Sequence, residues 1–287
     1  MASRQQIKSR IKSVRNTRQI TKAMQLVAAA RLRRAQESAY QTRRYAQAAY
    51  ELLTNLGARI QLAEHPLFKV RPVHARLIIV IASDQGLAGA YDGNILKEYL
   101  QVLQAARAEN QLTYTIAIGR KAVNFAARLE GVELIGTYVN FPDQPVANDL
   151  QPILSRSLEL FLDKTVDAVD VIYMHHLSSV VHEVRTAHLL PAGLGKQSPA
   201  RREIDFEPSA KIVLQTVVRR LVEVQLLQAL LEAAASQHSM RMLAMKNATD
   251  NATELADDLT LAYNNARQAA ITQELAEISG GAEALNT

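Results

Sequence analysis

The stretch whose residues come nearest to a chemical site is the glycine-rich segment SDQGLAGAYDG at residues 83–93. It follows the apolar run at residues 76–82 and precedes a helical pattern, which is where doubly wound α/β folds bind phosphate groups. The segment matches neither G-x-x-x-x-G-K-[ST] nor G-x-G-x-x-G, and no acidic residue stands clearly at the end of the next predicted strand. We therefore expect a tight strand-to-helix turn here rather than a nucleotide site.

Histidines are the second candidate for chemistry, because four of the seven, His175, His176, His182 and His188, fall in one region. Helical zinc sites need two histidines four residues apart, whereas His182 and His188 would lie about 20 Å apart on an extended strand. The chain has no cysteine and no G-x-S-x-G motif. With no plausible paired-carboxylate cleft either, we predict no catalytic residue, no metal site and no cofactor.

A basic surface at the start of the chain is the third candidate. The net charge of +5 is uneven: residues 1–57 carry 12 basic and 2 acidic side chains, residues 58–208 carry 15 and 17, and residues 209–287 carry 6 and 9. Such a segment calls for an acidic partner, which could be protein, nucleic acid or a membrane surface. Stacking aromatic residues are missing before Tyr40, which favours a solvated or protein-facing helix. The alternative is a nucleic-acid-binding coiled-coil protein with an α/β dimerisation domain.

Two long segments without glycine or proline, residues 3–56 and 209–279, carry the ends of the chain. Each is predicted to form a single helix, roughly 80 Å and roughly 105 Å long at 1.5 Å per residue, which is longer than a globular core. Small and apolar residues recur about every 3.5 positions from Ile7 to Leu56 and from Leu214 to Ala269, which is coiled-coil spacing. Because the chain returns through a central segment, we expect the two helices to pair antiparallel or obliquely crossed.

Apolar strands alternate with amphipathic helices between these two segments. Strands are predicted at residues 76–82, 114–118, 133–139, 169–175 and 180–190, helices at 94–107, 121–129 and 150–164, and a linker at 191–208. This alternation is typical of a mostly parallel sheet covered on both faces, as in a small Rossmann-like domain. The expected fold class is α/β, with an N-terminal coiled-coil helix at residues 1–57, a central globular domain at 58–208 and a C-terminal coiled-coil helix at 209–287.

Composition limits the class of protein and the compartment in which it can reside. The 48% hydrophobic content supports a real core, and the absence of cysteine fits a reducing compartment. No apolar run is long enough to span a bilayer, and residues 1–20 lack the apolar centre of a secretory signal. The sequence therefore predicts a soluble, intracellular protein.

Both ends of the chain resemble one family, the gamma subunit of F-type ATP synthases. The motifs are IKSRIKSVRNTRQITKAM at residues 7–24, VAAARLRRAQ at 27–36, MLAMKNATDNA at 242–252 and YNNARQAAITQELAEISGGA at 263–282. The family also places an α/β domain between two helices, so the resemblance covers the whole chain. The middle departs more, since the family's usual Asp-Arg-Gly-Leu-Cys-Gly stands here as DQGLAG at residues 84–89. Without cysteines, no thiol switch is expected.

The resemblance implies a central rotating shaft that couples ion flow, of protons or sodium, to the catalytic hexamer and has no active site of its own. Its partners would be the alpha and beta subunits around the coiled coil, with the epsilon subunit and the membrane c-ring at the globular foot. No nucleic acid and no cofactor would bind. The chain would be peripheral, at the cytoplasmic face of a bacterial plasma membrane.

The resemblance also implies contact residues, carried over by position. Arg267, Gln268 and Thr272 match the family's polar contacts to a catch loop of the beta subunit. Lys22 and Met24 match the part of the N-terminal helix that faces the same region. The family's beta subunits carry an acidic segment, which would be the partner of the basic helix.

Overall fold

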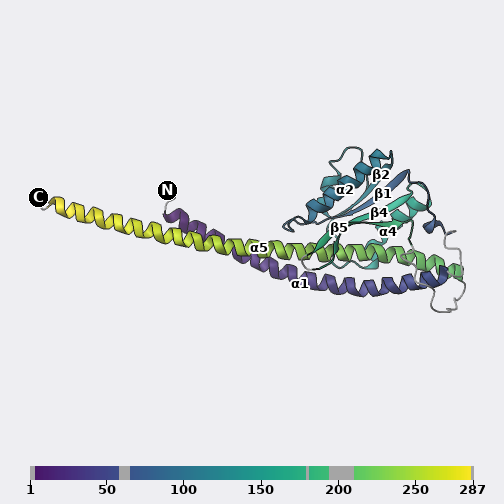
Figure 1. Ribbon diagram of the computed structural model, residues 1–287, viewed down its shortest axis with the longest axis horizontal. Helices are drawn as coiled ribbons and strands as arrows, with labels where there is room; N and C mark the ends of the chain where they lie inside the picture. The colour runs from purple at the N-terminus through teal and green to yellow at the C-terminus, as the bar shows by residue number, and fades with distance from the viewer. Residues whose placement is uncertain (1–3, 58–64, 179–180, 194–209, 286–287) are drawn as a thin grey trace. The chain divides into compact units, whose positions relative to one another are not determined.

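The computed structural model describes residues 4–57, 65–178, 181–193 and 210–285. Its elements are α1 (Arg4–Gly57), the short 3-10 helix η2 (Pro66–Phe68), β1 (Ala75–Ile81), α2 (Tyr91–Ala108), β2 (Leu112–Ile118), α3 (Arg120–Ala126), β3 (Glu133–Tyr138), α4 (Ala147–Leu162), β4 (Ala168–His176), β5 (His182–Leu190) and α5 (Ala210–Leu285) (Figure 1). Every predicted helix and strand is present, with ends that differ by a few residues. Helix α5 continues past residue 279 through two glycines, and most of the linker predicted at residues 191–208 lies outside the described residues.

A five-stranded sheet in the order β3-β2-β1-β4-β5 forms the centre of the α/β part. Strand β1 pairs in parallel with β2 and β4, and β2 with β3, while β5 pairs antiparallel with β4. The central strand β1 is buried almost throughout because both faces of the sheet are covered, whereas the edge strand β5 is largely half-buried or exposed. The mostly parallel sheet predicted from the sequence is confirmed.

Each face of the sheet has its own apolar core, because successive side chains of a strand point to opposite faces. Leu77 and Ile79 of β1 belong to a cluster that includes residues of α4 and α5. Ile78 and Val80 of the same strand belong to a second cluster with residues of α2 and α3. The sheet is therefore sandwiched between α2 and α3 on one side and α4 and α5 on the other.

The middle of α5 is buried or half-buried at every position from 221 to 241. A helix that is buried all round needs cover on every side, and here the sheet lies on one side and α1 on the other (Figure 1). Ser236 Oγ donates to Met174 O at 3.0 Å, and the Tyr91 hydroxyl donates to Ala233 O at 3.2 Å. The small side chains of Ala233 and Ser236 allow this close approach to the sheet.

The predicted stripe of small and apolar residues on α1 is buried or half-buried wherever its side chains are described, except at Thr17, which is exposed. Its buried members from the middle of the helix onward are Ala28, Leu32, Ala35 and Ala49. Arg43 contacts Glu232, whereas Ala49, later in α1, joins the core cluster that contains the earlier α5 residues Val218 and Leu221. The two helices therefore run antiparallel in this part of the molecule.

The chain divides into two compact units: residues 28–241, which hold the sheet and the adjoining parts of both helices, and residues 1–27 with 242–287. The division at residues 57 and 208 stays a prediction, since these units cut through the helices instead. Helix α1 and helix α5 also pair in the second unit, where the Thr21 and Thr249 hydroxyl oxygens lie 2.8 Å apart. None of the described helices combines the length and the apolar composition needed to cross a membrane.

The buried stripe of α5 in the second unit differs from the predicted one from Leu255 onward. Met245, Ala252 and Ala256 are buried. Leu255, which the prediction placed in the seam, is 46% exposed, and the seam positions Ala262 and Ala269 are exposed as well. Together with Thr249, the buried positions recur about every 3.6 residues, the period of a straight helix, rather than every 3.5 residues. The prediction for Leu255 was wrong because it extended a strict coiled-coil repeat too far.

Candidate functional site

The end of α5 presents a long exposed surface. From residue 267 to residue 279 every side chain is exposed except that of Ala270, which is half-buried. Ile271, Leu275 and Ile278 are 45%, 60% and 69% exposed and stand four and three residues apart, so they share one side of the helix. An uncovered apolar stripe of this kind marks a surface that contacts another protein.

This stripe was not predicted from the sequence, because the predicted seam runs through the alanines of the same segment. The sequence does contain a pattern that indicates this stripe, since isoleucine and leucine recur at helical spacing beyond the part of α5 that faces α1. Alanine and leucine both fit a 3.5-residue pattern, so spacing alone does not tell which stripe is covered inside the chain and which is left for a partner.

The five predicted contact residues all lie in the unit formed by residues 1–27 and 242–287. Arg267, Gln268 and Thr272 are exposed on α5, and Thr272 Oγ1 donates to Gln268 O at 3.0 Å. Lys22 is exposed on α1 and donates to a neighbouring glutamine of its own helix, and Met24 is half-buried in the interhelical seam.

The structure does not bring these five residues into one cluster. Thr21 contacts Thr249, and Arg267 stands 18 residues further along α5. At 1.5 Å per residue, Lys22 and Met24 therefore lie about 27 Å from Arg267 along the helix axis. The predicted residues form two separate zones, one on α1 and one near the end of α5.

Charge divides between the two helices of this unit. Residues 4–27 hold seven basic and no acidic side chains, whereas residues 242–279 hold two basic and six acidic side chains. Opposite charges attract across the helix pair over distances up to about 8–10 Å in physiological salt. The two paired helices of this unit therefore differ in the sign of their charge, basic on α1 and acidic on α5.

The glycine-rich segment at residues 83–93 forms a tight turn in which acidic side chains accept the backbone hydrogen bonds. Asp84 Oδ1 accepts from the backbone N–H groups of Arg120 at 3.0 Å and Asn140 at 2.9 Å. Asp92 accepts from the backbone N–H and the hydroxyl of Ser83. Such backbone N–H groups are the donors that a phosphate would use. Because carboxylates already occupy them with negative charge, the geometry supports a turn rather than a phosphate site.

A cavity of about 230 Å³ lies at the carboxyl ends of β1 and β2, between the sheet and α5. Asp143 is the centre of its charged lining, with Arg31 Nη1 at 3.1 Å and His238 Nε2 at 3.2 Å from its two oxygens. The hydrogen bond from His238 holds the pKa of Asp143 below its usual value. Arg241 donates to Gln85 O at 3.0 Å. Arg31 and His238 therefore meet at Asp143, and the cavity is a polar junction between the sheet, α1 and α5.

The neighbouring histidines make separate contacts. His175 Nδ1 lies 2.5 Å from Glu232 Oε2. His176 and His182 stand opposite each other on β4 and β5, with ring centroids 5.2 Å apart. Over the described part of the chain, no three histidine or carboxylate side chains gather closely enough to hold a metal ion.

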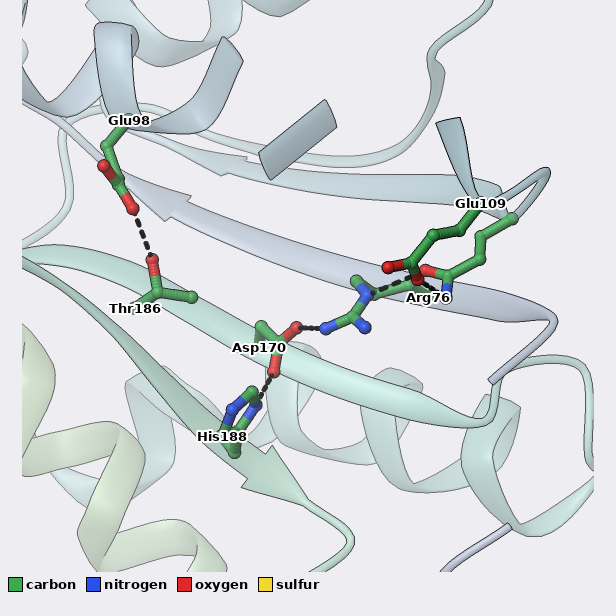
Figure 2. Close-up of polar contacts among 7 residues, drawn as sticks. Arg76, Glu98, Glu109, Asp170, Thr186 and His188 are labelled. Atoms are coloured by element: carbon green, nitrogen blue, oxygen red, sulfur yellow. Dashed lines mark hydrogen bonds and ion pairs between the residues drawn. The ribbon is translucent and has the colours of Figure 1, made fainter. Parts of the chain in front are cut away.

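A buried carboxylate ties the edge strand to the body of the sheet (Figure 2). Asp170 of β4 is fully buried, and its two oxygens contact Arg76 of β1 and His188 of β5. Thr186 of β5 donates to Glu98 of α2 at 3.2 Å. These contacts hold the antiparallel strand β5 against β4, 18 residues earlier in the sequence, and against α2, 88 residues earlier.

Comparison with known proteins decides what this scaffold is. The family described as ATP synthase matches residues 3–285. ATP synthase gamma chains of Staphylococcus haemolyticus and Staphylococcus epidermidis are 36% and 37% identical over 288 positions, which cover 99% of this chain and 100% of each relative. The chain belongs to the ATP synthase gamma chain family.

Chains in two solved ATP synthase structures have the same fold. A chain of the Euglena gracilis mitochondrial ATP synthase gives a TM-score of 0.67 at 18% identity, with 98% of this chain and 94% of that chain covered. A chain of the Tetrahymena thermophila central stalk and c-ring structure gives a TM-score of 0.60 at 23% identity, with 80% and 99% covered.

Membership of the gamma chain family confirms the interpretation drawn from the terminal motifs. The chain is a non-catalytic subunit of an ATP synthase and serves as its central shaft. The family match selects this role over the nucleic-acid-binding alternative, for which none of the three comparisons gives support.

Proposed function

We propose that this gamma-family chain turns inside a ring of alpha and beta subunits that surrounds residues 4–27 and 242–285. The α/β part, in residues 28–241, would contact the epsilon subunit and the membrane c-ring at the cytoplasmic face of a bacterial plasma membrane. The observation that carries this proposal is the exposed stripe of Ile271, Leu275 and Ile278, because an apolar helix side of this length requires a protein around it.

Two zones on the shaft would meet the beta subunits at different heights. Near the end of α5, Arg267 offers an exposed guanidinium, and Gln268 and Thr272 offer polar groups one turn apart. About 27 Å away along the helix, Lys22 presents a charge and Met24 a half-buried, flexible apolar side chain. This separation suits contact with two different segments of a beta subunit.

The shaft would change the catalytic sites only through contacts that differ between beta conformations. A ligand with equal affinity for two states shifts neither, so each zone must favour one conformation over another. As the shaft turns, the favoured beta subunit changes. An exposed arginine is suited to this task, because arginine is one of the residues that dominates binding energy once a partner covers it.

Replacement of Arg267 and Gln268 tests the zone near the end of α5. The double variant Arg267→Ala with Gln268→Ala should lower coupled ATP synthesis at least about tenfold, the effect of removing a single interface hot spot. Asp258→Ala is the control, since Asp258 is an exposed charged residue of the same helix between the two zones. A double variant as active as the control would refute the assigned contacts.

Trimming the end of α5 tests the same zone without a point substitution. Coupling should fall progressively as residues are removed from Thr287 inward, and deletion back to Asn264 should abolish it. Full coupling after that deletion would contradict the proposal.

Purification tests the choice of partner. The chain should co-purify with alpha and beta subunits after mild extraction. A nucleic-acid-binding protein would instead bring down nucleic acid, with an affinity that falls steeply with salt.

A further inference from the structure

Glu232 lies in the middle of α5, with a side chain that is only 6% exposed. His175 Nδ1 of β4 lies 2.5 Å from its Oε2 atom. Arg43 of α1 donates to its Oε1 atom at 3.2 Å, and Gln228, one turn earlier in α5, donates to the same atom at 2.6 Å. A single carboxylate therefore contacts the sheet, α1 and α5, and we call these four residues the Glu232 junction.

The carboxylate of the junction stays ionised. Burial raises the pKa of Glu232, but hydrogen bonds from Gln228 and His175 and the contact with Arg43 outweigh burial and hold the pKa below its usual value. A buried charge seldom adds net stability, since a well-packed apolar side chain often serves as well or better. The charge instead makes the contacts directional, because each hydrogen-bond donor must lie at a defined position relative to the carboxylate oxygens.

Packing beside the junction is incomplete. A cavity of about 430 Å³ lies between β5, α5 and Ala46 of α1, and Tyr173, Arg185 and Gln228 line it. Gln228 Oε1 is buried there without a hydrogen-bond partner. Burial and the charge of Glu232 raise the pKa of Tyr173, which also lines this cavity. Beside this gap, the polar bonds of the junction add directional ties to the apolar packing between the sheet and the two helices.

We propose that Glu232 is a positioning residue for torque: it fixes the α/β part to both shaft helices, so that a twist of one is passed to the other. Apolar surfaces resist separation, but they are not directional and permit small sliding movements. Charge-assisted hydrogen bonds to α1 and to β4 oppose such sliding. This inference rests on the rotor role proposed above.

The chain contains a matched control. Glu223, nine residues earlier in α5, also has a 6% exposed side chain, and its two oxygens accept from Arg220 of the same helix at 2.9 and 2.8 Å. Glu223→Gln therefore removes an equally buried carboxylate whose ion pair lies within α5. Any loss caused by burial of an amide in this helix should appear in both variants.

Reconstituted ATP synthase containing the full chain allows the test. Glu232→Gln keeps the size of the side chain but turns an amide N–H₂ group toward donors. Glu232→Met fills the same space without a polar group and should retain thermal stability. Both variants should assemble and hydrolyse ATP within twofold of wild type. Single-molecule torsional stiffness between a bead on the α/β part and the hexamer should fall at least twofold, together with ions pumped per ATP. Glu223→Gln should change neither quantity.

The possible results separate the two proposals. Wild-type stiffness and pumping in both Glu232 variants, or an equal loss in Glu223→Gln, would overturn the role of the junction. Failure of the wild-type chain to assemble with alpha and beta subunits would instead refute the rotor role. If neither Glu232 variant assembles, the variant Arg43→Ala tests the proposal instead. The Arg43 side chain is 62% exposed, so the fold should tolerate its removal, and torsional stiffness should fall as expected for the Glu232 variants. Unchanged stiffness in Arg43→Ala would then refute the proposal.

Discussion

Replacement of Asp170 by asparagine should loosen the edge of the sheet while leaving its centre intact. The carboxylate is fully buried between β1 and β5, where it contacts Arg76 and His188 (Figure 2). Asparagine has nearly the same volume and keeps one acceptor oxygen, so it creates no cavity. It removes the negative charge and turns an amide N–H₂ group toward one of the two donors.

The magnitude follows from the exposure of the three groups. Removing one partner of a fully buried ion pair costs about 3–5 kcal/mol, because the other charge is left uncompensated. Arg76 is 20% exposed and retains partial access to water, so the expected cost of Asp170→Asn is about 2–3 kcal/mol. The side chain of His188 is 73% exposed, so His188→Ala should cost less than about 1 kcal/mol.

Denaturant unfolding of the two variants measures these costs, and amide hydrogen exchange locates them. In Asp170→Asn the amides of β5 should lose more protection than those of β1 and β2, because β5 is the edge strand held by the carboxylate. If Asp170→Asn costs no more than His188→Ala, or if protection falls equally over all strands, the carboxylate is not the tie that we describe.

Three further predictions follow from single features of the structure. Gly119 has a φ of +91°, and a Cβ atom there would lie 2.1 Å from Ala82 O, so Gly119→Ala should lower the free energy of unfolding by at least about 3 kcal/mol, as measured by denaturation. Burial raises the pKa of Asp167, but hydrogen bonds from two backbone N–H groups and an arginine outweigh it and lower the pKa below its usual value. A carboxyl group whose pKa is lower in the folded than in the unfolded state stabilises the fold at pH values above the unfolded pKa of about 3.9, and this stabilisation is lost as pH falls through the folded pKa. The cost of Asp167→Asn, measured as the free energy of unfolding against pH, should therefore shrink below about pH 4. The exposed Ala269 and half-buried Ala270 give the shaft a surface of low adhesion, so Ala269→Leu with Ala270→Leu should slow rotation, and an unchanged rotation rate and torque would count against this reasoning.

Periodicity and composition were sufficient to predict the elements of the fold. Two glycine-free and proline-free segments indicated the long helices, and alternating apolar strands and amphipathic helices indicated the parallel sheet. The seam of α1 followed from small residues such as Ala28 and Ala35. The seam of α5 could be followed only as far as Ala252, because the choice between Leu255 and Ala256 depends on whether the helix supercoils or stays straight.

Contacts between distant residues could not be predicted from the sequence. Glu232 meets a histidine 57 residues earlier and an arginine 189 residues earlier, and no local pattern signals either contact. Of the four histidines weighed as metal ligands, His175 and His188 are partners of carboxylates, and neither contact could be foreseen from spacing. Asp84 was read as part of a turn, but its role in accepting the N–H groups of Arg120 and Asn140 required the strand order.

Three buried or nearly buried carboxylates gather around one strand, and the topology explains why. Strand β1 is joined to β2 through α2, and β2 to β3 through α3, but β4 lies beside β1 only after the chain has passed through β2, α3, β3 and α4. Asp167, just before β4, accepts from Arg71 and from the backbone N–H groups of His74 and Ala75 at the start of β1.

The other two carboxylates also connect β4 to neighbouring elements. Asp170 joins β4 to β1 and β5, and Glu232 joins β4 to both long helices. Strand β4 and the residue just before it therefore carry charged ties to β1, β5 and both long helices. In a shaft that must carry torque from its α/β part to its helices, these directional bonds resist a sliding movement that apolar packing alone permits.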